Sequence, residues 1–140
     1  APSKFDFDEK VYEYSISMKR QIIIQLNGIK PEIFLRHNFL ANNIWNDITP
    51  IVGLFDGSGG RGILAKEWPS PIVHSGILVG YAGGLNPDNL EEEIEKIQKV
   101  ADGHDIWLDM ETGIRSKSEL YDMFSIAKVK QCCEIVKGFL

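Results

Sequence analysis

Glycine recurs at three places in this chain of 140 residues, each time at the end of a short apolar run, and two of the three segments also contain an acidic residue. Residues 56–62 read Asp-Gly-Ser-Gly-Gly-Arg-Gly, residues 82–84 read Ala-Gly-Gly, and residues 111–113 read Glu-Thr-Gly. Glycine lets the backbone approach a bound group closely, so N–H groups in such segments can hold an anion such as phosphate. One segment of this kind is usually a plain turn, but three at equivalent positions predict a phosphate site.

Asp56 is the candidate for acid–base chemistry, because it stands directly at the end of an apolar run. Burial there could raise the pKa of its carboxyl group and suit it to general-acid or general-base work. The alternative is that Asp56 caps its own loop by accepting hydrogen bonds from the N–H groups of Ser58 or Gly59. The sequence leaves both roles open.

Three further polar residues each have a functional and a structural interpretation. Arg61 could bind an anionic substrate or simply be solvated, and Asn27 could point into the site or cap a turn. For Asp109 we expect a structural hydrogen bond to neighbouring strand ends or loops. No metal site is predicted, because no Cys, Asp or Glu stands at metal-ligand spacing from any of the three histidines, His37, His74 and His104.

The elements that must position these residues follow from the apolar pattern. Strands are predicted at residues 21–28, 48–55, 74–82 and 105–109, the first two apolar on both faces as in strands buried inside a sheet. Helices are predicted at residues 8–20, 31–46, 86–100 and 125–137, the third with Asn86 as N-cap, Pro87 in its first turn and an end at Asp102.

Two of these helices carry a clear apolar stripe. The stripes are Leu90, Ile94, Ile97 and Val100 in the third helix, and Ile126, Val129, Cys133 and Val136, expected to face the sheet, in the fourth. Strands that alternate with helices form parallel βα units, so we expect one α/β domain over residues 1–140 with about four such units. Ligands of such folds bind at the carboxyl ends of the strands, where all three glycine-rich segments are expected.

Composition narrows the class of protein. With 44% hydrophobic and 25% charged residues the chain fits an ordinary globular domain, and no apolar run approaches the ~20 residues of a membrane span. A net charge of −5 argues against nucleic-acid and membrane partners. Cys132 and Cys133 are adjacent and cannot form an ordinary structural disulfide with each other, which fits a reducing, cytoplasmic setting. No cofactor is predicted.

Four segments, taken in order, resemble the phosphoribosylanthranilate isomerase family, a (βα)8 TIM barrel of tryptophan biosynthesis. They are Ile24-Gln-Leu-Asn-Gly28, Leu54-Phe-Asp-Gly-Ser-Gly-Gly-Arg-Gly62, Ala82-Gly-Gly-Leu-Asn-Pro-Asp-Asn89 and Leu108-Asp-Met-Glu-Thr-Gly-Ile-Arg115. The third is the most specific. The resemblance covers residues 21–140 and corresponds to the second half of the barrel.

The resemblance implies an isomerase that carries out an Amadori rearrangement of a phosphoribosyl amine. It implies that the ligand phosphate is held by Gly59, Gly60, Gly62, Gly83, Gly84, Thr112 and Gly113, and that Asp56 is the general acid. The family's general base is a cysteine at the end of the first strand, and this sequence has none there. The family's Ser-Ser-Gly becomes Glu111-Thr112-Gly113, which puts a carboxylate near the expected phosphate.

The four predicted βα units also indicate whether the chain needs a protein partner. Half a barrel leaves two sheet edges exposed, so we expect either a missing N-terminal half or a homodimer. The start of the chain, which has neither an initiator Met nor a signal-peptide pattern, favours a piece of a longer protein. Two alternatives to the isomerase stay open: a non-catalytic barrel that binds a phosphorylated small molecule, and a half-barrel that self-associates.

Overall fold

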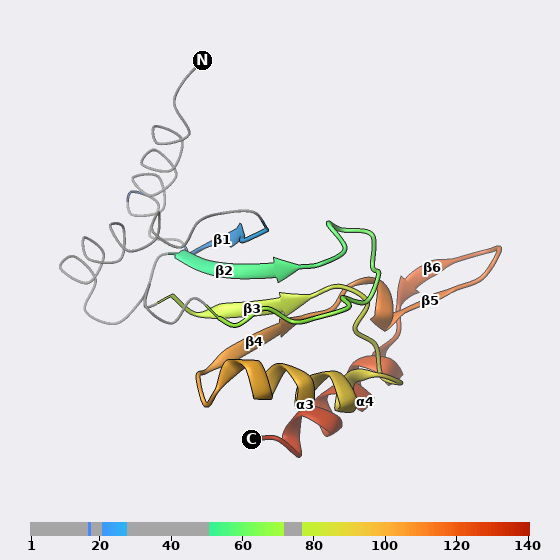
Figure 1. Cartoon of the computed structure of the whole chain (residues 1–140). Helices are drawn as coiled ribbons and strands as arrows, with labels where there is room; N and C mark the ends of the chain where they lie inside the picture. Colours follow the sequence, from blue (N-terminus) through green and yellow to red (C-terminus); the bar gives the residue numbers. More distant parts are fainter. Residues whose placement is uncertain (1–16, 18–20, 28–50, 72–76) are drawn as a thin grey trace. The chain divides into compact units, whose positions relative to one another are not determined.

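The computed structural model of the chain describes residues 17, 21–27, 51–71 and 77–140 (Figure 1). Four strands form one sheet in chain order: β1 (Ile22–Gln25), β2 (Ile51–Asp56), β3 (Val79–Ala82) and β4 (Ile106–Asp109). All four arrows point the same way in Figure 1, and β1 pairs with β2 in parallel register. The prediction of a parallel α/β fold is therefore confirmed.

The described residues fall into two compact units. The first contains those up to position 55 together with those of 71–80 and 104–107, and the second contains residues 56–70, 81–103 and 108–140. The carboxyl ends of β2, β3 and β4 thus belong to the second unit, together with the loops that follow them.

The strands differ in burial according to their place in the sheet. β3 lies between two neighbours and all four of its residues are buried. β1 was predicted to be buried on both faces, and this is wrong: its residues alternate between half-buried and exposed, and Ile23 is 57% exposed. The reason is that β1 is an edge strand of the described sheet, with a neighbouring strand on one side.

Helix α3 (Leu90–Ala101) begins later than predicted. The predicted N-cap, Asn86, makes the side-chain bond of a cap, accepting from the Asp88 N–H at 2.9 Å, but it opens a turn before the helix, in which its backbone oxygen accepts from the N–H groups of Asn89 (3.2 Å) and Leu90 (3.0 Å). The Asn89 side chain accepts from the Asn86 N–H at 2.9 Å and closes this turn. The predicted end is confirmed, because Asp102 caps the helix in the left-handed conformation (φ 49°). Of the predicted stripe, Leu90, Ile94 and Ile97 are buried and Val100 is half-buried.

Helix α4 (Ile126–Lys137) starts at the predicted place, with the Ser125 hydroxyl accepting from the Lys128 N–H. Its predicted buried stripe is only partly right: Val129 and Val136 are half-buried, but Ile126 is 67% exposed and Cys133 is exposed, whereas Cys132 is buried. The prediction assumed a helix lying on the sheet. In the structure α4 contacts α3 and the 3-10 helix Thr112–Ile114, which turns a different face inward.

A short hairpin between β4 and α4 was not predicted. Its strands are β5 (Arg115–Lys117) and β6 (Asp122–Phe124), and it extends away from α3 and α4 in Figure 1. Arg115 holds it together, because its Nε donates to Asp122 Oδ1 at 2.6 Å and its guanidinium lies 4.6 Å from the centre of the Phe124 ring. The Lys128 ammonium donates to the Arg115 backbone oxygen at 2.7 Å and ties the hairpin to α4.

The two cysteines are expected to differ in reactivity. Burial, and then the neighbouring Cys133, raise the pKa of the Cys132 thiol, so little of it is thiolate at neutral pH. A thiol-specific alkylating reagent should therefore add one label, at Cys133, to the folded chain and a second only after unfolding. Intact mass followed by peptide mapping measures this. Equal labelling rates at both positions in the folded chain would contradict the buried position of Cys132.

Some predictions lie outside the described residues. These are the helix at 31–46, the helix at 8–20 apart from Ser17, the first residues of the second and third strands, and the histidines His37 and His74. Within the described part of the chain, no helix has both the length and the apolar character needed to cross a membrane.

Candidate functional site

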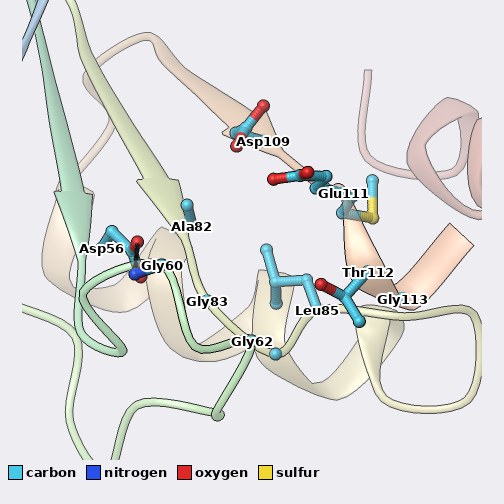
Figure 2. A pocket seen from close by; sticks show the side chains of 12 residues that line it. Asp56, Gly60, Gly62, Ala82, Gly83, Leu85, Asp109, Glu111, Thr112 and Gly113 are labelled. Carbon is cyan, nitrogen blue, oxygen red and sulfur yellow. Dashed lines mark hydrogen bonds between the residues drawn. The ribbon is translucent and has the colours of Figure 1, made fainter.

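A pocket lies at the carboxyl ends of β2, β3 and β4, entirely within the second unit (Figure 2). It is lined by Asp56 at the end of β2 with Gly60 and Gly62 beyond it, by residues 82–85 at and after the end of β3, and by residues 109–113 at and after the end of β4. Its volume is about 50 Å3, room for a few water molecules or one small group of a ligand. The three glycine-rich segments selected from the sequence therefore meet at one place.

Asp56 holds the first of these segments. Its Oδ1 accepts hydrogen bonds from the N–H (2.9 Å) and the hydroxyl (2.7 Å) of Ser58, and its Oδ2 accepts from the Gly60 N–H at 2.6 Å. Burial alone would raise the pKa of Asp56, but these hydrogen bonds outweigh it and the net effect is a lowered pKa. Asp56 is therefore a carboxylate at neutral pH, and the capping role is the one the structure displays.

Most N–H groups of this first segment donate to acceptors within the segment. The Gly59 N–H donates to the Asp56 backbone oxygen and the Gly62 N–H to the Ser58 hydroxyl, both at 3.1 Å, in addition to the bond from Gly60. The N–H groups of Gly59, Gly60 and Gly62, three of the glycines expected to bind phosphate, therefore point at acceptors within the loop itself and not at a ligand.

Other N–H groups of the pocket have no such acceptor. Among the backbone hydrogen bonds of the turns and loops of the described residues, none comes from the N–H groups of Gly83, Gly84 and Gly113. The Gly83–Gly84 turn is held in place by the side-chain amides of Asn86 and Asn89, which both donate to the Gly84 oxygen. These three N–H groups are the donors that the pocket can present to an anion.

Two more carboxyl groups, those of Asp109 and Glu111, line the pocket. Figure 2 shows them on one side of the pocket and Asp56 with Gly60 on the other. Partial burial, and then the charges of Glu111 and Asp56, raise the pKa of Asp109. The structural hydrogen bond expected for Asp109 is not found among the described residues, so its carboxyl group faces the pocket without an internal acceptor or donor.

The opposite pKa shifts separate the roles of two carboxyl groups at equivalent strand ends. Hydrogen bonds lower the pKa of Asp56, whereas the pKa of Asp109, an exposed residue, is raised by partial desolvation and then by the charges of Glu111 and Asp56. Such a division is typical of sites that move protons. The signal for Asp109 was present in the sequence, since it follows an apolar run in the same way as Asp56.

The other predicted residues lie as follows. Thr112 lines the pocket, whereas Arg61 is exposed and its Nε donates to the Ser58 backbone oxygen at 2.8 Å. Arg61 thus braces the loop from outside, and Gly59 is likewise not a lining residue. Asn27 is exposed and belongs to the first unit. Leu85 and Met110 line the pocket but were not selected from the sequence, and Ala82 and Glu111 were selected only as members of their glycine-rich segments.

No protein-family model, curated protein or solved structure matches this chain. Among the described residues, no group of three or more His, Cys, Asp or Glu side chains is placed to hold a metal ion. The pocket combines backbone N–H donors with three carboxyl groups, those of Asp56, Asp109 and Glu111.

Proposed function

We propose that this chain binds a phosphorylated ribose derivative in the pocket and is a diverged phosphoribosylanthranilate isomerase-like protein with a TIM-barrel type of fold. The observation that carries the proposal is the set of unengaged N–H groups, those of Gly83, Gly84 and Gly113, beside Asp109. A parallel sheet whose strands follow chain order without reversal supports the barrel type.

The proton chemistry of the proposal centres on Asp109. Opening the ring of a phosphoribosyl amine needs a proton on the ring oxygen, and a carboxyl group with a raised pKa is suited to supply it. The family resemblance assigns that role to Asp56, but its lowered pKa argues for a loop anchor instead. Glu111, the remaining carboxyl group of the pocket, takes the position of proton acceptor in this scheme, in place of the family's cysteine.

A calorimetric titration tests the binding step. Ribose 5-phosphate and inorganic phosphate are titrated into the chain at matched ionic strength, and we expect saturable binding that favours the sugar phosphate. Preference for the sugar phosphate would come from the carboxyl groups, which can accept hydrogen bonds from its hydroxyls. If neither compound binds, the glycine-rich segments are turns and the proposal fails.

Asp109→Asn is expected to lower turnover of a phosphoribosyl amine by about 100-fold or more, the usual effect of losing a general acid. Stability at neutral pH should not fall, because a raised pKa means that ionising Asp109 in the folded chain costs free energy as the pH rises. Steady-state rates and urea unfolding measure the two effects. Asp105→Asn, at an exposed position outside the pocket lining, is the control. Full turnover by Asp109→Asn would contradict the assignment of Asp109 as the general acid.

Binding without turnover is the second candidate, and the engagement of Asp56 with its own loop favours it. In that case the residue matched to the family's acid has become structural, and the pocket keeps only its anion donors. The unmodified chain would then bind ribose 5-phosphate but show no isomerisation of a phosphoribosyl amine above the rate of the Asp109→Asn variant.

A further inference from the structure

The segment that carries the first glycine-rich turn is a long and mostly exposed loop. Between positions 59 and 70 every residue except Trp68 is exposed or half-buried. At its start the segment is held by Asp56 and Ser58. Trp68 is therefore the anchor of its far end.

Trp68 is fixed by a buried carboxylate on α3. Its indole Nε1 donates to Glu93 Oε2 at 2.7 Å, and Glu93 is only 3% exposed. The other oxygen of Glu93 accepts from the Lys96 ammonium, also at 2.7 Å, so the buried charge has a partner. The Trp68 ring meets the Tyr81 ring edge to face at 5.7 Å, and the Tyr81 hydroxyl donates to the Pro69 oxygen at 2.8 Å.

Residues 57–70 are in direct contact with the Gly83–Gly84 turn of the pocket. A Cβ placed on Gly84 would lie 2.5 Å from the Leu64 Cα, so the two backbones touch. Ile63 and Leu64 are both exposed and stand midway between the Asp56 anchor and Trp68. Their position against Gly84 therefore depends on both ends of the segment.

We infer that Glu93, which does not line the pocket, is a positioning residue of the candidate site: through Trp68 it holds residues 57–70 against the Gly83–Gly84 turn. This inference concerns the geometry of the loop. Its consequence for ligand affinity rests on the proposed function, whereas the order of the loop does not. The two can therefore be tested apart.

The experiment is amide hydrogen exchange on the full chain, read at the Gly60 and Gly62 N–H groups, which are bonded to Asp56 and Ser58. Trp68→Phe removes the donor and Glu93→Leu removes the acceptor. Each is expected to speed exchange at these glycines about tenfold, the effect of one lost hydrogen bond to a charged group. Exchange at Ile97, in the buried face of α3, reports whether the whole unit has loosened instead.

Two further variants separate positioning from general stability. Glu93→Gln keeps an acceptor for Trp68 and should restore slow exchange at the glycines. Glu92→Gln removes a carboxylate that also binds Lys96 at 2.7 Å but is exposed and lies away from Trp68, so it should behave as the unmodified chain. Equal acceleration by Glu92→Gln and Glu93→Leu would overturn the inference, as would unchanged exchange at Gly60 and Gly62 in Trp68→Phe.

The same variants link the loop to the ligand. If the unmodified chain binds ribose 5-phosphate, Trp68→Phe and Glu93→Leu should weaken that binding about tenfold or less, and Glu93→Gln should recover it. If the unmodified chain does not bind, the proposed function fails and the exchange data alone decide the role of Glu93. If Trp68→Phe and Glu93→Leu speed exchange at the glycines but bind ribose 5-phosphate as the unmodified chain does, the segment is held in place for another purpose. That result would contradict its role at this site.

Discussion

Gly84→Ala is expected to destroy the pocket and to lower the free energy of unfolding by on the order of 3 kcal/mol. Gly84 has φ +70°, and its Cβ would lie 2.5 Å from the Leu64 Cα and 2.8 Å from the Ile63 carbonyl carbon. These are backbone atoms, so no side-chain rotation relieves the overlap, and the two segments must move apart. Urea unfolding measures the stability, and titration with ribose 5-phosphate measures the site.

Gly103→Ala is the matched control for this substitution. Gly103 also has a positive φ, +79°, but a Cβ there would meet no atom within 4 Å. It should therefore cost only the strain of a left-handed alanine, about 1 kcal/mol, and leave ligand binding unchanged. If the two variants lose the same stability, the contact between Gly84 and the 63–64 backbone does not matter in solution.

Asp56→Asn is expected to cost about 2–4 kcal/mol of stability at neutral pH. An asparagine oxygen can still accept from Ser58, but its NH2 group would then face the Gly60 N–H, placing donor against donor. The Gly-rich turn should lose its shape, and amide exchange at Gly59 and Gly60 should rise with it. A variant as stable as the unmodified chain would show that these hydrogen bonds add nothing.

The stability lost in Asp56→Asn should become smaller as the pH falls. The pKa of Asp56 is lowered in the folded chain from its ordinary value of 3.8, so its stabilising contribution is complete well above 3.8 and disappears as the pH falls toward the lower, folded pKa. The unmodified chain and Asp56→Asn should therefore differ most near pH 7 and converge under acid. Urea unfolding at several pH values measures this difference in stability. Asp105→Asn is the control, because it leaves Asp56 in place and should lose stability under acid as the unmodified chain does.

Much of the sheet could be predicted from sequence because its signal is local. Each strand is a short apolar run, and the rule that parallel strands present ligands at their carboxyl ends brought Asp56, Gly83 and Gly113 together correctly. What failed depended on neighbours distant in sequence. The exposure of Ile23 follows from the edge position of β1, and the inward face of α4 follows from its contacts with α3.

The roles of the carboxyl groups were harder to predict than their positions. Asp56 and Asp109 have the same side chain and equivalent places in the sequence pattern. Their pKa values shift in opposite directions because Ser58 and Gly60 turn back onto Asp56, whereas Asp109 is partly desolvated and then feels the charges of Glu111 and Asp56. Hydrogen bonding of this kind depends on the path of the loop, which composition and spacing do not specify. The start of α3 was missed for a related reason, since Asn86 forms a turn with Asn89 before the helix begins.

The hairpin of β5 and β6 has a practical consequence for anyone who wishes to attach something to this chain. Its tip is closed by a hydrogen bond from the Ser118 N–H to the Tyr121 oxygen, and Leu120 is 94% exposed. Lengthening a flexible loop costs only about 0.6 kcal/mol for each doubling of its length. A fluorophore, an affinity tag or a small inserted domain placed at the tip would thus leave the residues of the pocket in place. It would allow the chain to be detected or immobilised in the binding experiments.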